Sequence, residues 1–394
     1  MGVDGRSAQA MRHTKLIALM LLGVFLLAAT PESEAKKRRK GPDYGSINVP
    51  EEGTIRFERL TTDNDCVSYK RVGKNRTKTL NKREDLLKMD WWANPQIAVS
   101  PDGSKIAYIN QKNETNNVMV KPASAGGASV QRTFRTNVFD FSWSPDGNTI
   151  CFTEYRDGHF GIYLVDATQG NVVRQITNSQ DNDYAGKLTN DGNEIFFHRG
   201  EGRDTYSIWS YDRSTNLFSN YSRGMSAIPD PYNPGTLYCA RFTNNRESEI
   251  WRINTKTGVE EIILSIPGRS FTTPQLSPNG HWLIVTGSSF AEKDEVVNTD
   301  IFAVRTDGTD FTQLTYHPGN DLSGVWAPDG NSIFFLSQRG SGAQIYNVWK
   351  MSFDLNTPAD YRTPQASTPA PAEKAEPKNN TVSNTRSRLN GKKK

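Results

Sequence analysis

Two aspartates with matching surroundings are the clearest candidates for chemistry in this chain. Asp183 and Asp321 each follow an asparagine, and each stands seven residues before a recurring turn. Carboxylate and amide side chains in this pattern can bind a peptide or a glycan, or they can bond loop N–H groups and tie neighbouring structural units together. Aromatic residues in the same segments suit protein contacts and sugar stacking equally. The candidate binding residues are Asn94, Asp183, Tyr184, Arg269, Phe271, Tyr316, His317, Asn320 and Asp321.

Other residue types that commonly catalyse reactions or bind metals are sparse. Four histidines follow residue 35, at positions 159, 198, 281 and 317, and their places in the repeat described below differ. This scatter favours packing or solvated histidines over a metal site. The three cysteines have no zinc-site spacing, and neither a Gly-x-Ser-x-Gly elbow nor a Gly-rich phosphate loop occurs. We therefore predict that the chain is not an enzyme and requires neither a metal nor a cofactor.

An internal repeat, built on the turn Ser-Pro-Asp-Gly, positions the candidate residues. Clear copies span 98–108, 142–152, 275–285 and 325–335, and weaker ones span 188–197 and 232–238. The turn glycines, at 103, 147, 192, 235, 280 and 330, are separated by 44, 45, 43, 45 and 50 residues. Proline fixes φ, aspartate bonds its own backbone and glycine supplies a positive φ, so each copy predicts a hairpin turn. A period of about 45 residues is typical of a four-stranded propeller blade.

The last copy of the repeat lacks a fourth strand downstream, because a Pro-rich tail follows the strand at 346–351. A segment at 55–61 has the pattern of the missing strand and matches 311–315. An N-terminal strand that completes the last blade would remove the open edges. We predict an all-β fold, a six-bladed β-propeller of four-stranded antiparallel blades, closed by an N-terminal strand. In that fold the candidate residues face the channel mouth.

The segments outside the repeats have distinct compositions. Residues 1–35 have a basic start, an apolar run at 16–29 and small residues before a cleavage site, as in a secretory signal peptide. We expect cleavage after Ala35 and export to the periplasm. The remaining predicted boundaries are 36–53 for a basic leader, 54–354 for the propeller, 54–61 for its closing strand, 62–94 for an insertion, 95–354 for the blades and 355–394 for a disordered, basic, Pro-rich tail.

The net charge of +4 comes from basic residues near the ends of the chain. Segments 36–53 and 355–394 carry +2 and +5, residues 1–35 cancel, and 54–354 carries −3. A slightly acidic propeller argues against a nucleic-acid partner. The basic ends suit peripheral contact with an anionic membrane surface.

The repeat, followed by strands rich in Ile, Phe and Tyr, resembles the TolB-type β-propeller repeat over about 54–353. Similar repeats occur in the propellers of prolyl-oligopeptidase-like peptidases and of some pectin lyases. TolB is a periplasmic partner of outer-membrane lipoproteins, and its channel receives the partner. Its N-terminal α/β domain has no counterpart in the 18 residues between Ala35 and Thr54, so the chain is TolB-like.

From this resemblance we predict a non-catalytic periplasmic propeller that binds a protein partner at its channel mouth. The partner would be an outer-membrane lipoprotein or another envelope component, and the role would be envelope organisation or transport. The alternative is a propeller that binds or cleaves polysaccharide, like a lyase, with its site in the channel.

Overall fold

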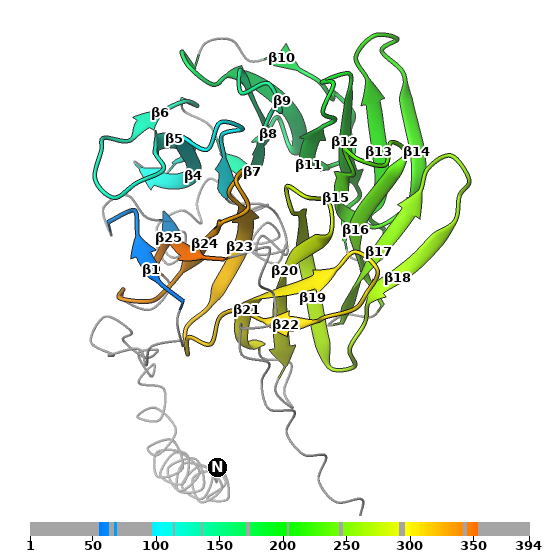
Figure 1. Ribbon diagram of the computed structural model, residues 1–394. Helices are drawn as coiled ribbons and strands as arrows, with labels where there is room; N and C mark the ends of the chain where they lie inside the picture. The colour runs from blue at the N-terminus through cyan, green and yellow to red at the C-terminus, as the bar shows by residue number, and fades with distance from the viewer. Residues whose placement is uncertain are drawn as a thin grey trace, which may run out of the picture.

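The computed structural model describes most of the repeat region. The described residues are 55–62, 67–68, 97–112, 115–134, 137–170, 174–202, 205–243, 247–290, 296–341 and 345–353. Every regular element within them is a β-strand (Figure 1). In this part of the chain no helix has the length and apolar character needed to cross a membrane. The prediction of an all-β fold is confirmed, whereas the signal peptide, the leader, the tail and Asn94 lie outside the described residues.

Three sheets each contain four antiparallel strands in sequence order. The first sheet comprises β3 (Ile97–Val99), β4 (Lys105–Lys112), β5 (Thr115–Pro122) and β6 (Val130–Gln131). The second comprises β7 (Val138–Trp143), β8 (Thr149–Arg156), β9 (His159–Asp166) and β10 (Arg174–Gln175). The third comprises β11 (Asp183–Leu188), β12 (Glu194–Arg199), β13 (Ser207–Asp212) and β14 (Phe218–Arg223). Each sheet is a simple meander, as the repeat predicts.

A larger sheet contains the next two meanders. Its first half comprises β15 (Met225–Pro229), β16 (Thr236–Phe242), β17 (Ser248–Asn254) and β18 (Glu260–Leu264). Its second half comprises β19 (Arg269–Leu276), β20 (Trp282–Phe290), β21 (Val296–Arg305) and β22 (Thr312–Gln313). One parallel pair, Ser248 opposite Ser270, joins β17 to β19.

The last sheet combines strands from both ends of the repeat region. It comprises β23 (Asp321–Trp326), β24 (Ser332–Ser337), β25 (Ile345–Ser352) and β1 (Phe57–Arg59), and β2 (Val67–Ser68) also pairs with β25. Phe57 lies opposite Met351 and Arg59 lies opposite Trp349 in an antiparallel register. Figure 1 shows β1 beside β25, with β24 and β23 beyond it. The N-terminal segment therefore pairs with the strand chosen for it from the sequence.

In several sheets, a threonine near the outer edge accepts the same kind of hydrogen bond. Its Oγ1 accepts a hydrogen bond from an N–H of the third strand, in the pairs Thr133 with Val118 (2.9 Å), Thr177 with Ile162 (2.9 Å) and Thr315 with Ile301 (3.0 Å). Thr61 accepts the equivalent bond from Val348 at 2.8 Å. The N-terminal segment thus occupies the position of a fourth strand in its sheet.

Apolar side chains fill the spaces between neighbouring sheets. One buried cluster unites Ile106 and Tyr108 of β4 with Phe334 and Leu336 of β24, and it includes Leu60 from the N-terminal segment. The first and last sheets therefore pack against each other. Burial of this kind contributes about 25 cal/mol for each Å² of apolar surface removed from water.

Candidate functional site

A cavity of about 790 Å³ lies where the first strands of the meanders end at the recurring turns. Its wall includes one apolar residue from each of the six first strands, namely Ile97, Phe141, Leu188, Ile228, Leu276 and Val325. This volume falls in the range of about 300–1,000 Å³ that is usual for ligand pockets. Because all six first strands contribute to it, the cavity is a candidate ligand site.

The recurring turns at the cavity edge have the bonding predicted for them. In the first turn Ser100 Oγ donates to Asp102 Oδ1 at 2.5 Å, and Ser104 N–H donates to the same oxygen at 3.0 Å. The Ser100 hydroxyl, followed by the Ser104 N–H, lowers the pKa of Asp102 to about 2. The turn carboxylates are therefore occupied by local bonds that hold the edge of the cavity in place.

The pairing between the first and second strands is irregular at similar positions in five of the meanders. The pairing register shifts between Tyr184 and Lys187 in β11, and equivalent shifts occur in β7, β15, β19 and β23. Four residues at these shifts have a positive φ, namely Ala185 (53°), Ser226 (51°), Thr273 (48°) and Ser323 (56°). This conformation costs a residue other than glycine about 1–3 kcal/mol, so it requires support from its surroundings.

Polar side chains of the preceding sheet provide that support. Ala185 N–H donates to Asp140 Oδ1 at 3.0 Å, and Ser323 N–H donates to Thr286 Oγ1 at 3.0 Å. Ser226 N–H donates to Nδ1 of His198 at 3.2 Å. Burial lowers the pKa of His198 to about 3, so the ring is neutral at physiological pH. This histidine therefore holds two sheets together.

Asp140 is expected to give the stability a pH dependence. Its Oδ1 accepts bonds from the Thr153 hydroxyl at 2.6 Å and from Ala185 N–H, but burial raises its pKa to about 7. An unfolded aspartate has a pKa of about 3.9, so between these values the native state binds the extra proton. The free energy of unfolding therefore falls as pH rises from about 4 to about 7.

We expect Asp140→Asn to be more stable than wild type at about pH 8, by roughly 1–4 kcal/mol, and similar to it at about pH 4. Urea unfolding across this range measures the difference. Asp102→Asn is the control, because a carboxyl with a lowered pKa stays ionised in both states above about pH 5. Parallel pH profiles for wild type and Asp140→Asn would contradict this role for Asp140.

The candidate residues on β11 and β19 are mostly buried. Asp183 is fully buried and accepts bonds from Arg199 Nε (2.7 Å) and Nη2 (3.0 Å). Burial raises the pKa of Asp183, and Arg199 opposes that rise. Tyr184 and Phe271 have no exposed surface, and Tyr184 stacks on His198 with ring centroids 5.2 Å apart. Arg269 lies partly buried over the ring of Phe302, at 5.6 Å.

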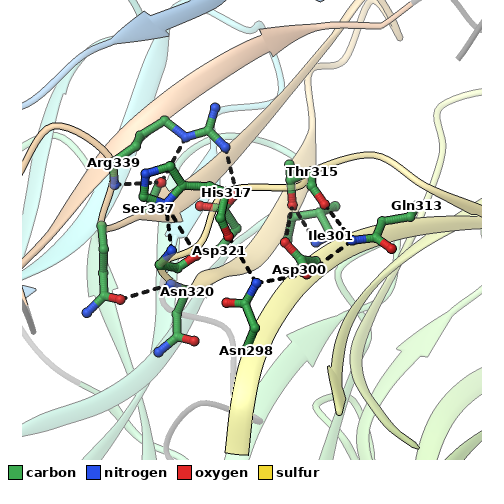
Figure 2. A network of polar contacts seen from close by, with 12 residues as sticks. Asn298, Asp300, Ile301, Gln313, Thr315, His317, Asn320, Asp321, Ser337 and Arg339 are labelled. Atoms are coloured by element: carbon green, nitrogen blue, oxygen red, sulfur yellow. Dashed lines mark hydrogen bonds and ion pairs between the residues drawn. The ribbon is translucent and has the colours of Figure 1, made fainter. Parts of the chain in front are cut away.

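Three of the candidates around β23, His317, Asn320 and Asp321, lie in the polar network shown in Figure 2. Asp321 Oδ2 accepts a bond from Arg339 Nη2 at 2.7 Å, and both side chains are almost completely buried. Asn320 Oδ1 accepts the N–H of Thr299 at 3.1 Å, which links this network to β21. His317 Nδ1 accepts the Gly319 N–H at 2.9 Å, and burial lowers the pKa of His317. Tyr316 stays 43% exposed.

None of the eight described candidates lines the cavity. They stand at the starts of the first strands or in adjoining loops, whereas the cavity lies at the strand ends that meet the turns. The alternative interpretation had the two aspartates bonding loop N–H groups and tying neighbouring units together, whereas both accept bonds from arginine side chains of their own sheets. The ion-pair partners of Asp183 and Asp321 differ, because each carboxylate pairs with an arginine of its own sheet.

A cavity residue that the sequence argument missed is Lys187, a basic residue within the otherwise uncharged segment 184–188. That break in the pattern was the available signal. Among the described residues, no group of three or more His, Cys, Asp or Glu side chains is arranged to hold a metal ion.

Comparison with known proteins identifies the family. The sequence matches the TolB beta propeller domain over residues 88–226 and 235–367. The chain belongs to this family. A structure assigned as TolB from Agrobacterium tumefaciens is 16% identical with a TM-score of 0.50, and the match covers 66% of this chain and 90% of that chain. The TolB-type resemblance inferred from the Ser-Pro-Asp-Gly repeat is thereby confirmed.

Two further relatives carry the names of enzymes. The uncharacterized peptidase YuxL of Bacillus subtilis (strain 168) is 24% identical over 238 residues, which are 57% of this chain and 34% of that protein. This chain therefore spans about a third of the length of that curated relative. An oligogalacturonate lyase from Vibrio parahaemolyticus is 11% identical with a TM-score of 0.51, and the match covers 78% of this chain and 96% of that chain.

These relatives contradict the prediction that the chain is not an enzyme. That prediction was wrong because it rested on missing motifs. A missing nucleophile elbow excludes one arrangement of hydrolase residues, whereas one fold supports many chemistries through different sites.

Proposed function

We propose that the sheets form one closed ring of six four-stranded blades, in which the N-terminal strand completes the last blade. The pairing of β1 with β25 supports this closure, as does the hydrogen bond that Thr61 Oγ1 accepts from Val348 N–H. The apolar cluster shared by the first and last sheets supports it as well. The eight-stranded sheet counts as two blades, because a single pair joins its halves.

In this proposed ring the cavity lies on the axis. The cavity then binds an extended segment of a partner protein. The observation that carries this proposal is the wall itself, to which all six first strands contribute apolar side chains. Trp143 and Trp326 also line it, and their indole N–H groups donate to Gly147 O (2.9 Å) and Gln275 O (3.1 Å). Fixed aromatic and apolar surfaces suit the side chains of a polypeptide.

The partner that we propose is an outer-membrane lipoprotein or another envelope component in the periplasm, which the chain reaches after cleavage at Ala35. The family membership and the signal-peptide pattern of residues 1–35 support this location. The fold shared with an oligogalacturonate lyase supports a second candidate, an acidic glycan in the same cavity. The apolar wall favours the polypeptide.

A photo-reactive amino acid at position 276, in the cavity wall, tests the binding proposal. The matched control carries the same group at position 217, where Leu217 is 65% exposed and does not line the cavity. After irradiation with envelope extract, we expect position 276 alone to give an adduct with one protein, mapped to one segment by mass spectrometry. Mass analysis of that segment also reports cleavage.

Identical adducts at both positions, or none at position 276, would contradict a cavity that binds a partner. Suppression of the adduct by oligogalacturonate, together with binding of that glycan to the purified protein, would favour the glycan instead.

A further inference from the structure

Lys187 is the one basic side chain among the described residues that line the cavity. It lies on β11, directly opposite Phe196 of β12, and it is partly buried. Neither a hydrogen bond nor an ion pair within the described part of the protein engages its ammonium group. A partly desolvated ammonium without a bonding partner in the protein gains stability when a ligand supplies one.

The acidic residues of the same wall are already engaged. Asp191 accepts the Thr189 hydroxyl at 2.6 Å, and Asp230 accepts the Tyr232 N–H at 2.8 Å. Glu194 lies on the strand beside Lys187 and accepts the Ser210 hydroxyl at 2.9 Å, with no ion pair to the lysine. Within the described residues, none of these carboxylates forms an ion pair with Lys187, so its ammonium group is available to a ligand.

The backbone at Lys187 is held in place by close packing. A Cβ on the preceding Gly186 would lie 2.5 Å from Cys151 Sγ and 3.0 Å from Ile162 Cγ2, so only glycine allows β11 to approach β8 and β9 this closely. Burial raises the pKa of Cys151, so its thiol is neutral and gives no counter-charge. Burial also lowers the pKa of Lys187, as expected for an ammonium that lacks a partner.

We propose that Lys187 recognises a carboxylate on the segment bound in the cavity. The inference rests on the proposed function, because it assumes that the cavity receives a polypeptide. The carboxylate comes either from the C-terminus of the segment or from an Asp or Glu side chain within it. In both cases a charge-assisted hydrogen bond of about 2.7–2.9 Å would replace the hydration that the ammonium has lost.

Binding of fluorescent hexapeptide pools to the purified mature chain tests this assignment. One pool is uncharged with an amidated C-terminus, a second has a free C-terminus, and a third is amidated but contains one Glu. Wild type should prefer at least one carboxylate pool over the uncharged pool by about 10-fold or more. The second and third pools distinguish the two sources of the carboxylate.

Lys187→Met keeps the apolar stem and should reduce binding of the preferred pool to the level of the uncharged pool. Lys187→Gln is a second neutral variant in case the first folds poorly. Lys187→Arg retains the positive charge and should keep the preference for the carboxylate pool within about 3-fold of wild type. Lys105→Met removes an exposed lysine of β4 and should change nothing. Thermal unfolding of each variant checks the fold.

An undiminished carboxylate preference in Lys187→Met and Lys187→Gln would overturn the assignment. Equal binding of all pools by wild type would also overturn it, while leaving the cavity as a peptide site. Failure of every pool to bind would contradict the proposed function itself, and the inference would fall with it. Strong binding of oligogalacturonate with no peptide binding would assign Lys187 to a glycan and overturn the polypeptide proposal.

Discussion

Replacing Arg339 by methionine is expected to lower the free energy of unfolding by about 3–5 kcal/mol. The Arg339 and Asp321 side chains are 4% and 0% exposed, and their ion pair is 2.7 Å long. Without the guanidinium, Asp321 keeps a buried charge with no counter-ion. Arg339 also lies over the ring of Phe57 at 4.1 Å, so the variant loses a contact with the N-terminal strand as well.

Urea unfolding measures this loss. The control is Arg305→Met, whose ion pair with Asp310 is exposed (35% and 58%) and should contribute less than about 1 kcal/mol. Adding Asp321→Asn to Arg339→Met should recover part of the stability, because it removes the unpaired charge. A loss no larger than that of the Arg305 control would show that the buried pair does not stabilise this sheet.

The turns were predictable from the sequence because their chemistry is local. Ser100, Asp102 and Ser104 bond one another within five residues, so the motif alone determines the geometry. The same holds for the strands on either side, whose spacing follows the repeat. Fold class and strand order therefore follow from the repeat alone.

The pairing of the candidate aspartates was not predictable, because their partners are distant in sequence. Asp183 pairs with Arg199, sixteen residues away, and Asp321 with Arg339, eighteen residues away. Neither arginine belongs to the repeated turn, so nothing in the pattern marked the aspartates as paired. The sequence argument also placed the site at the starts of the strands, whereas the cavity lies at their other ends.

The pairing between the two ends of the repeat region was predictable for a different reason. Thr61 and Val348 are 287 residues apart, but the repeat showed that one strand was missing from the last copy. A candidate of the same pattern occurred at the N-terminus. Counting the repeats thus predicted a tertiary contact that local secondary-structure propensity could not indicate.

Closure of the ring is the claim on which the axial position of the cavity and both binding proposals depend. Glu58 lies directly opposite Lys350 in the pairing of β1 with β25. Residues opposed in this way have Cα atoms about 4.5–5.5 Å apart, which is within reach of a disulfide. The double variant Glu58→Cys with Lys350→Cys, combined with Cys66→Ser, therefore tests the closure.

Under mild oxidation, a closed ring predicts a monomer with a disulfide joining positions 58 and 350, identified by mass spectrometry after proteolysis. The bond closes a very long loop and should raise the free energy of unfolding by roughly 2–5 kcal/mol over the reduced form. Glu58→Cys with Thr168→Cys, in the same background, should form no internal bond. Disulfide-linked dimers alone, or no bond between 58 and 350, would contradict a ring closed by the N-terminal strand.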